Sequence, residues 1–452
     1  MNRRRSISAI AFTLELLEPG GVGRPAPLRE NELDIVLDRA PDGRVHLPGT
    51  SLAGALRAHV RAARGAQRAD AWFGSVTGAG SQTVAVASPI WVGSSVLDST
   101  TVPVHRWTTA IDRGRGAARH RHLRGAEEQP AEASFPVTIL WEDATHGDVD
   151  DLAAMIAGWR PLLGRATSTG HGRCAVRDVR VGHLPLSTDA GLLSWLTTDS
   201  GALAAQIATD EPARTGPDRP LTHWSVRFRL AGPTLVSTTS TDETGQVVRI
   251  PLRDSGAPLL PGSSLKGVLR SRVELVLRSV GLSACETQRC GECLACGYFG
   301  FGGDDTRRAS VGQRGRVRVL SARVVDQLDG HTVHTRVTTH VAIDRFTGGA
   351  AMRTGQGGLL YKVEAPDTGD VTLSLDVTEL PDDERSLFGA LVRIVVDDMH
   401  RGLARVGHST TRGYGHLVVL DGHIDGLPSL TEARAALAAA VADAGVTDGG
   451  AR

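Results

Sequence analysis

The sequence has little of several features that mark common protein classes. Aromatic residues make up 4% of the 452 residues, lysine occurs only at Lys266 and Lys362, and cysteine occurs five times. No segment approaches the ~20 apolar residues that a membrane-spanning helix needs. Glu15 interrupts the apolar run at 7–17, so this run predicts a first β-strand rather than a signal peptide. We therefore expect a cytoplasmic protein without a membrane segment.

The charge balance excludes a uniformly basic nucleic-acid binder. Formal net charge is zero and the isoelectric point is about 7.3, although a locally basic groove is compatible with both. The 41% hydrophobic and 22% charged residues are typical of a globular protein. The length predicts two or three domains.

Four motifs occur twice along the chain, in the same order. Leu-Pro-Gly-Thr-Ser-Leu at 47–52 returns as Leu-Pro-Gly-Ser-Ser-Leu at 260–265, and Trp-Phe-Gly at 72–74 returns as Tyr-Phe-Gly at 298–300. Ile-Asp-Arg at 111–113 returns at 343–345, and the glycine-rich turn at 169–173 returns at 412–416. Four ordered matches indicate an internal duplication of one module.

Each half predicts the same order of secondary structure. An apolar strand precedes the Pro-Gly motif, whose hydroxyls we expect to cap a helix, and two strands, a second helix and a final strand follow. This is the order of the ferredoxin-like fold. We predict an α+β protein with modules at 1–185 and 223–427, a polar linker at 186–222, and a C-terminal helix and tail at 428–452.

Four of the five cysteines form a short cluster, Cys285, Cys290, Cys293 and Cys296. Four thiolates at this spacing predict a closed tetrahedral zinc site, which is structural rather than catalytic; a redox pair is the alternative. The interval from Pro261 to Phe299 is 13 residues longer than that from Pro48 to Phe73, so the cluster occupies an insertion at 285–296. The fifth, Cys174, is expected to be a buried small hydrophobic residue.

Three further features are compatible with phosphate or RNA binding. Helix starts with hydroxyls and cations can bind phosphate or can simply be capped, and glycine-rich turns can contact a ribose-phosphate or merely reverse the chain. The arginine-rich run at 113–124 and its counterpart at 345–353 can bind RNA or form solvated loops. The candidate RNA-binding residues are Ser51, Arg57, Arg113, Arg115, Arg119, Arg121, His171, Arg173, Ser263, Ser264, Lys266, Arg270, Arg345, Phe346, Met352, Arg412 and Tyr414.

These landmarks together resemble the RAMP superfamily, in particular the backbone subunits of type III CRISPR effectors. Pro-Gly-Ser-Ser-Leu-Lys-Gly at 261–267, Ile-Asp-Arg-Phe-Thr-Gly-Gly at 343–349 and Gly-Tyr-Gly at 413–415 carry the resemblance. It implies RRM-like modules with thumb hairpins near 112–124 and 344–353. The implied partners are a CRISPR guide RNA, a target RNA and other effector subunits. The two-module fusion with a cysteine-rich insertion is similar to type III-D variants.

The resemblance also implies cleavage of target RNA by a loop aspartate with a divalent metal ion, magnesium. The family aspartate lies six positions before a second aspartate ahead of the Pro-Gly motif. Here six positions before Asp38 is Glu32, and six before Asp254 is Val248, so the pattern departs from the family. The remaining candidates are Asp34 and Asp242, whereas Asp38 and Asp254 sit closer to the helix and are expected to be structural.

Two hypotheses about the function therefore stay open: an endoribonuclease within a CRISPR complex, and a purely structural RNA-binding backbone subunit. A third, a zinc-containing DNA-binding regulator, is disfavoured because the sequence shows no recognition helix or dimer pattern.

Overall fold

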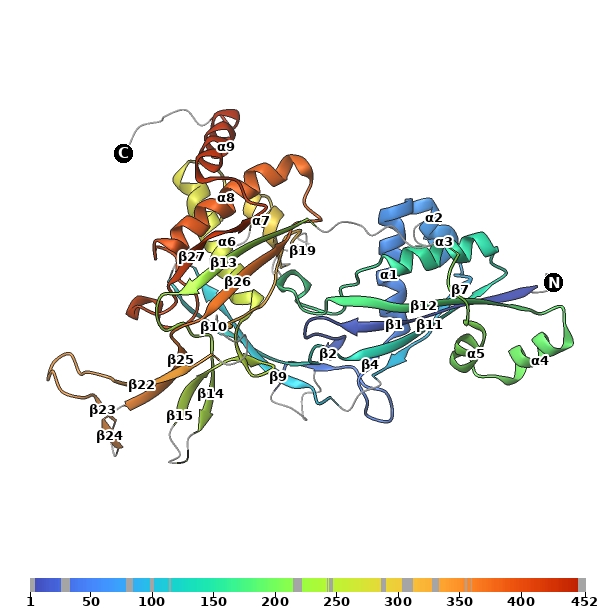
Figure 1. The fold of residues 1–452 in the computed structure, drawn as a ribbon, viewed down its shortest axis with the longest axis horizontal. Coiled ribbons are helices and arrows are strands. Elements are labelled where there is room, and N and C mark those ends of the chain that lie inside the picture. Colours follow the sequence, from blue (N-terminus) through green and yellow to red (C-terminus); the bar gives the residue numbers. More distant parts are fainter. Residues whose placement is uncertain are drawn as a thin grey trace. The chain divides into compact units, whose positions relative to one another are not determined.

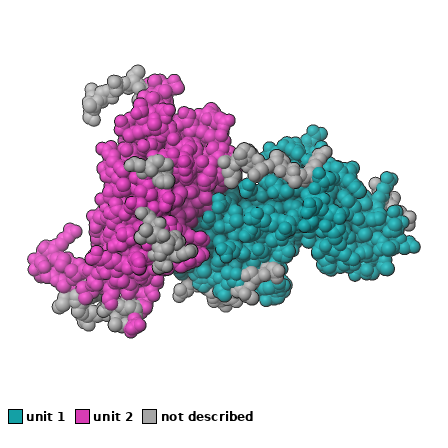
Figure 2. Space-filling model, viewed as in Figure 1, with its two compact units in different colours: residues 1–110, 120–167, 171–220 teal, residues 111–119, 168–170, 221–452 magenta. Residues whose placement is uncertain are grey.

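The computed structural model of this chain describes residues 5–25, 33–78, 84–97, 101–113, 115–213, 222–241, 243, 247–285, 290–302, 312–326, 333–353, 356–358 and 360–445. Contacts divide the chain into two compact units (Figure 2). Unit 1 comprises residues 1–110, 120–167 and 171–220, and unit 2 comprises residues 111–119, 168–170 and 221–452. In the described part of the chain, no helix is long and apolar enough to span a membrane.

The elements up to residue 213 are drawn in blue to green in Figure 1. They are β1 (Ser6–Leu16), β2 (Gly23–Pro25), β3 (Ile35–Leu37), β4 (His46–Leu47), α1 (Gly49–Arg64), α2 (Ala66–Phe73), β5 (Ser75–Thr77), β6 (Val84–Val86), β7 (Ile90–Val92), β8 (Ser95–Val96), β9 (Val104–Asp112), β10 (Ala117–Glu128), β11 (Ser134–Glu142), α3 (His146–Ala157), β12 (Cys174–Pro185), α4 (Asp189–Thr197) and α5 (Ser200–Ile207), with a 3-10 turn at Thr167–Thr169.

The main sheet of unit 1 has the strand order β12-β1-β11-β7, with every pair antiparallel. Alternate residues of β1, such as Ile10, Phe12 and Leu14, face a core that α1 and α3 complete with Leu56 and Ile156. Strand alternation therefore buries one face under two helices, as the period-two pattern of β1 requires. This is the ferredoxin-like arrangement, so the predicted fold class is confirmed.

The stretch at 186–222, which we predicted as a polar linker, contains helices α4 and α5. Leu203 and Ala204 of α5 are fully buried. Ala204 packs with Ile7, Ala9 and Leu140, which lie on the face of the β1–β11 pair opposite α1 and α3. The composition suggested a linker because polar residues outnumber the few apolar side chains that attach α5 to the sheet.

The elements after residue 221 are drawn in green to red in Figure 1. They are β13 (His223–Leu230), β14 (Ser237–Thr241), β15 (Val247–Pro251), β16 (Arg253–Asp254), β17 (Ala257–Leu260), α6 (Gly262–Ser279), α7 (Leu294–Phe299), β18 (Gly300–Phe301), β19 (Gln313–Arg314), β20 (Arg318–Val319), β21 (Ala322–Arg323), β22 (Thr335–Val341), β23 (Met352–Arg353), β24 (Gln356–Gly358), β25 (Leu360–Pro366), β26 (Asp370–Asp376), α8 (Asp382–His400), β27 (Leu417–Asp425) and α9 (Leu430–Asp443), with a 3-10 turn at Thr410–Arg412.

Unit 2 repeats the fold of unit 1. Its main sheet has the order β20-β26-β13-β27, again antiparallel throughout. Val226 and Phe228 of β13 pack in one core with Leu269 of α6 and Leu391 and Val395 of α8. The equivalence of β1, α1, β11, α3 and β12 with β13, α6, β26, α8 and β27 is the structural counterpart of the repeated motifs.

The repeated Pro-Gly motifs begin helices α1 and α6, but the expected hydroxyl caps are absent. In each helix the proline is the N-cap and provides no side-chain hydrogen bond. Gly49 N–H instead donates to Ser94 Oγ at 3.1 Å, and Gly262 N–H donates to Ser321 Oγ at 3.0 Å. The capping prediction is wrong because a serine far along the chain satisfies the first N–H in both repeats.

A second four-stranded sheet carries a hairpin in each repeat. The strand orders are β2-β3-β10-β9 and β14-β15-β25-β22. After β9, the Asp112 carbonyl accepts Gly116 N–H at 2.8 Å. After β22, the Asp344 carboxylate accepts the backbone N–H groups two and three residues later at 2.8 and 2.9 Å, and these bonds lower the pKa of Asp344. The repeated aspartate therefore organises the turn where each thumb hairpin was expected.

Two glycines in the glycine-rich turn of unit 2 differ in how closely other atoms pack around them. Gly413 and Gly415 both have positive φ, +93° and +79°, but a Cβ at Gly413 meets nothing within 4 Å, whereas one at Gly415 would lie 2.0 Å from the Val406 oxygen. Gly413→Ala should lower the free energy of unfolding of unit 2 by about 1 kcal/mol. Gly415→Ala should lower it by a further ~1–3 kcal/mol, because backbone must move. Hydrogen exchange of α8 peptides measures both; equal losses would contradict the packing argument.

Candidate metal centre and nucleic-acid interface

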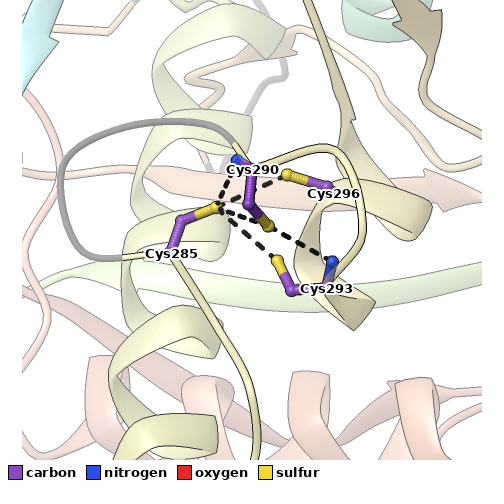
Figure 3. Close-up of side chains that lie close together, drawn as sticks. All are labelled: Cys285, Cys290, Cys293 and Cys296. Carbon is purple, nitrogen blue, oxygen red and sulfur yellow. Dashed lines mark hydrogen bonds between the residues drawn. The ribbon is translucent and has the colours of Figure 1, made fainter. Parts of the chain in front are cut away.

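The four clustered cysteines lie after α6 and at the start of α7 in unit 2, and their side chains point toward one another (Figure 3). Cys285 follows α6, Cys293 is the N-cap of α7, and Cys296 lies inside α7. Helix α7 ends at the second copy of the aromatic-Phe-Gly motif, and Gly300 has nearly the same φ, +77°, as Gly74, +76°. The cysteines are therefore inserted into the second repeat just before a turn that both repeats share.

The sulfur positions fit a tetrahedral metal ion. The four Sγ atoms lie within 4.8 Å of one another, and Cys285 Sγ is 3.4 Å from Cys290 Sγ and 3.6 Å from the Sγ atoms of Cys293 and Cys296. A tetrahedral site with Zn–S bonds of about 2.3 Å requires sulfur atoms roughly 3.8 Å apart. Four thiolates leave no position for water, so the donor set suits a structural ion.

Backbone N–H groups and burial act in opposite directions on the thiols of the cluster. Cys290 N–H donates to Cys285 Sγ at 3.2 Å, and Cys293 N–H donates to Cys290 Sγ at 3.3 Å. Burial raises the pKa of Cys285 to about 12. Partial desolvation also acts on Cys290, but backbone donors at 292 and 293 outweigh it and lower the pKa of Cys290 to about 7. A bound cation would supply the remaining stabilisation of the thiolates.

Two arginines of α6 reach the cysteine loop. Arg278 donates to the Cys285 carbonyl oxygen. Arg270 is 6% exposed and donates to Glu274 at 2.7 Å and to Cys296 Sγ at 3.3 Å. The sequence motif predicts Arg270 as an RNA contact; its guanidinium lies buried beside the cysteines, because α6 turns that position toward α7.

A cluster of rings and one arginine lies at the glycine-rich turn of unit 2. His340 of β22 and Tyr361 of β25 are cross-strand partners, and their rings stack with centroids 5.0 Å apart and an interplanar angle of 19°. The exposed Arg412 lies over the Tyr361 ring, 5.7 Å from its centroid, and donates to its hydroxyl. Tyr414, which is buried, places its hydroxyl 3.1 Å from His340 Nε2. The two predicted residues, Arg412 and Tyr414, thus lie with two rings that the sequence analysis missed.

The corresponding turn in unit 1 has different chemistry. His171 is 8% exposed and lies 3.4 Å from Glu128, which also accepts from Arg106 at 2.7 Å. Burial alone would raise the pKa of Glu128, but His171 and Arg106 together lower it to about 2. The predicted RNA contact His171 therefore belongs to a buried ion network, and Arg173 lies 3.7 Å from Glu18. This turn presents few exposed groups.

The helix-start candidates differ in exposure. Ser263 is exposed, and Ser51 and Ser264 are half-buried. Lys266 is 9% exposed, so most of its side chain is inside the protein. Arg57 pairs with Asp70 on α2.

The hairpin candidates are mostly exposed. Arg115, Arg119 and Arg121 are exposed, whereas the Arg113 side chain is 16% exposed and forms an ion pair with Glu274 at 2.8 Å. In the second hairpin Arg345 is exposed and Phe346 is fully exposed, at 100%. The side chain of Met352 lies outside the described residues.

The candidate catalytic acids divide into three groups. Asp34 accepts Gly125 N–H at 2.8 Å through its carboxylate. Asp38 pairs with His46 at 2.8 Å, and Asp254 pairs with Arg323 at 2.7 Å. Glu32 and Asp242 lie outside the described residues.

Comparison with known proteins gives a family. The family model described as the RAMP superfamily matches residues 13–175 and 207–418, which is more than half of the chain. This chain belongs to the RAMP superfamily. No curated protein matched it. Two solved chains, titled as the type III-B Cmr-beta complex bound to cognate target RNA and in its apo state, are each 12% identical, with TM-scores of 0.32 and 0.31; each match covers 37% of this chain and 96% of the other.

Two rings at the turn of unit 2, His340 and Tyr361, were not predicted from the sequence of this RAMP protein, and neither were Glu128 and Arg106 of the buried ion network in unit 1. Tyr361 is one of three tyrosines in the chain, and it lies 21 residues after His340. Only strand pairing in register brings these two rings together, so no short motif could have shown the contact. Cys174, in contrast, is 1% exposed, and burial raises its thiol pKa to about 12, as expected for a small hydrophobic residue.

Proposed function

We propose that this RAMP protein is a backbone subunit of a type III CRISPR effector, which binds guide RNA, positions target RNA against it and contacts other effector subunits. Family membership over both repeats supports the assignment. The observation that carries RNA binding is the cluster of His340, Tyr361 and Arg412 at the glycine-rich turn of unit 2.

Single-stranded RNA is recognised by aromatic faces for its bases and by cations for its phosphates. The His340–Tyr361 pair supplies the rings on a strand surface, and the exposed Arg412 supplies a cation beside them. Gly413, with φ of +93°, lets the backbone turn next to this pair without a side chain. Arg115, Arg119 and Arg121 on the first hairpin would add phosphate contacts.

Tyr361→Ala should weaken single-stranded RNA binding by the full chain by about 5- to 150-fold, because a stacked base is worth about 1–3 kcal/mol. Arg412→Ala should also weaken binding, and more so at low salt, because it removes a cation that would contact phosphate. Fluorescence anisotropy with labelled RNA at two salt concentrations measures the loss. Tyr361→Phe keeps the ring and should bind nearly as well as wild type.

The matched control for Arg412 is Arg401→Ala, which removes an exposed arginine that pairs with Asp397 at 3.5 Å instead of lying over a ring. Alanine at Arg115, Arg119 and Arg121 together should reduce the salt slope by about two units. RNA affinity that is the same in Tyr361→Ala, Arg412→Ala and wild type would remove this cluster from the interface.

We assign zinc to the four cysteines, because closed all-thiolate tetrahedral sites suit it. When bound, the ion would join α6 to α7 and replace a hydrophobic core that the inserted loop is too short to form.

Purified protein should contain about one zinc per chain, and Cys290→Ser should lose it and destabilise unit 2 far more than unit 1. Elemental analysis and hydrogen exchange report the two effects. Cys174→Ala is the control, because that buried cysteine lies in unit 1 and should leave the zinc content unchanged. Carefully prepared wild-type protein without zinc would refute the assignment.

We further propose that loop carboxylates of this protein cut the target RNA. In-line attack by a ribose 2′-hydroxyl requires a splayed nucleotide and a group that assists proton transfer. Asp34 or Glu32 in the first repeat, and Asp242 in the second, are the candidates. A divalent ion such as magnesium, when bound, would offset the developing negative charge.

Asp34→Ala and Asp242→Ala should each slow one cut roughly 10²-fold and leave guide binding and the other cut intact. Cleavage of labelled target by the purified complex with magnesium gives both rates. Asp254→Asn is the control, since Asp254 pairs with Arg323. Wild-type positions and rates in both alanine variants would exclude these carboxylates. A wild-type complex that never cuts would support the second candidate function, a structural RNA-binding subunit whose sister subunits cleave.

A further inference from the structure

Glu274 of α6 is a buried carboxylate that faces two guanidinium groups. It is 1% exposed, its Oε1 accepts from Arg270 Nε at 2.7 Å, and its Oε2 lies 2.8 Å from Arg113 Nε. Arg113 belongs to segment 111–119, which groups with unit 2. A carboxylate buried to this degree is strongly unfavourable unless cations face it, so both arginines are needed to keep it inside.

Arg270 connects this carboxylate to the cysteine cluster. Its Nη2 donates to Cys296 Sγ at 3.3 Å, and its Nη1 donates to the Gly300 carbonyl oxygen just after α7. The guanidinium is a rigid planar fork, so holding its two Nη atoms fixes the direction of Nε toward Glu274. One side chain therefore touches a metal ligand and the carboxylate that receives Arg113.

We propose that Arg270 and Glu274 couple metal binding at the four cysteines to the position of segment 111–119. The inference rests on the metal site proposed above and adds a role for it. A bound ion fixes Cys296, and Cys296 together with Gly300 holds Arg270. Arg270 in turn orients Glu274 so that its second oxygen faces Arg113. Loss of the ion frees the short helix α7, which carries Cys296, and this chain of contacts loses its fixed end.

The coupling would give a structural ion an influence on RNA contacts. Segment 111–119 begins with the end of β9, ends with the start of β10, and carries the exposed Arg115 and Arg119. The ion site and Glu274 would thereby help to hold these arginines in one position, which reduces the conformational entropy lost when RNA binds.

The first test is hydrogen exchange of segment 111–119 in the full-length, zinc-loaded protein. Removal of zinc by a chelator should speed exchange of this segment by about 5- to 150-fold, the usual range of a coupling between sites. Glu274→Gln should speed it similarly while zinc stays bound, as elemental analysis would verify. Asp398→Asn is the control. Asp398 of α8 forms a 2.6 Å ion pair with Arg272, which lies on α6 like Glu274, and this pair is not part of the path to the cysteines.

The second test uses the reciprocity of coupling. If zinc holds segment 111–119 in place, the docked segment must strengthen zinc binding by the same factor. Arg113→Ala, which removes the guanidinium that faces Glu274, should therefore raise the zinc dissociation constant in chelator competition by the factor measured in the first test. Arg115→Ala, an exposed neighbour, should leave it unchanged.

Several results would overturn the proposal. One is protection of segment 111–119 that does not change with zinc or in Glu274→Gln. Another is zinc affinity of Arg113→Ala equal to wild type, and a third is faster exchange spread evenly over unit 2, which would indicate general destabilisation. Wild-type protein without zinc would defeat the metal assignment itself, a failure that elemental analysis distinguishes from loss of coupling in a zinc-loaded protein.

Discussion

The close approach of backbone to backbone at the glycine-rich turns is the constraint on which both repeats depend. A Cβ at Gly172 would lie 1.9 Å from the Leu163 oxygen, and one at Gly415 would lie 2.0 Å from the Val406 oxygen. Each turn leads directly into the last strand of a ferredoxin-like sheet, so this contact sets where that strand enters. Because a side chain at either glycine would collide with backbone, each turn packs closely against the preceding part of the chain. The neighbouring residues of the turn then lie close to the second sheet and contact its side chains.

The two repeats share this backbone packing, but the side chains at their glycine-rich turns differ. The turn of unit 1 closes over a buried ion network in which Glu128 faces Arg106 and His171. The turn of unit 2 carries Arg412 over a stacked pair of rings with partly exposed surfaces. Ion pairs that are desolvated mainly specify local geometry, whereas rings and cations at a surface remain available to a ligand. The two repeats therefore share the packing of the turn but differ in the side chains that it carries.

The cysteine insertion is attached to the core of unit 2 through helix α7. Helix α7 keeps the buried aromatic pair of the repeated motif, and Tyr298 and Phe299 pack on Phe388 of α8. The cysteines precede and enter this short helix, and α6 supplies the arginines that contact the loop. A six-residue helix has little intrinsic stability, so tertiary packing such as that of Tyr298 and Phe299 on Phe388 must hold it.

The sequence by itself determined the duplication, the α+β class, the order of elements and the four cysteines, because these depend on local pattern and on spacing along one chain. It could not determine which arginine reaches solvent. Arg270 and Arg412 are both repeat-motif arginines, yet helix rotation buries the first against Cys296 while a positive-φ turn exposes the second. Pairing of His340 with Tyr361, of Gly262 with Ser321 and of Glu274 with Arg113 joins residues far apart in sequence. Only strand register and helix packing bring such residues into contact, and these are properties of the folded chain.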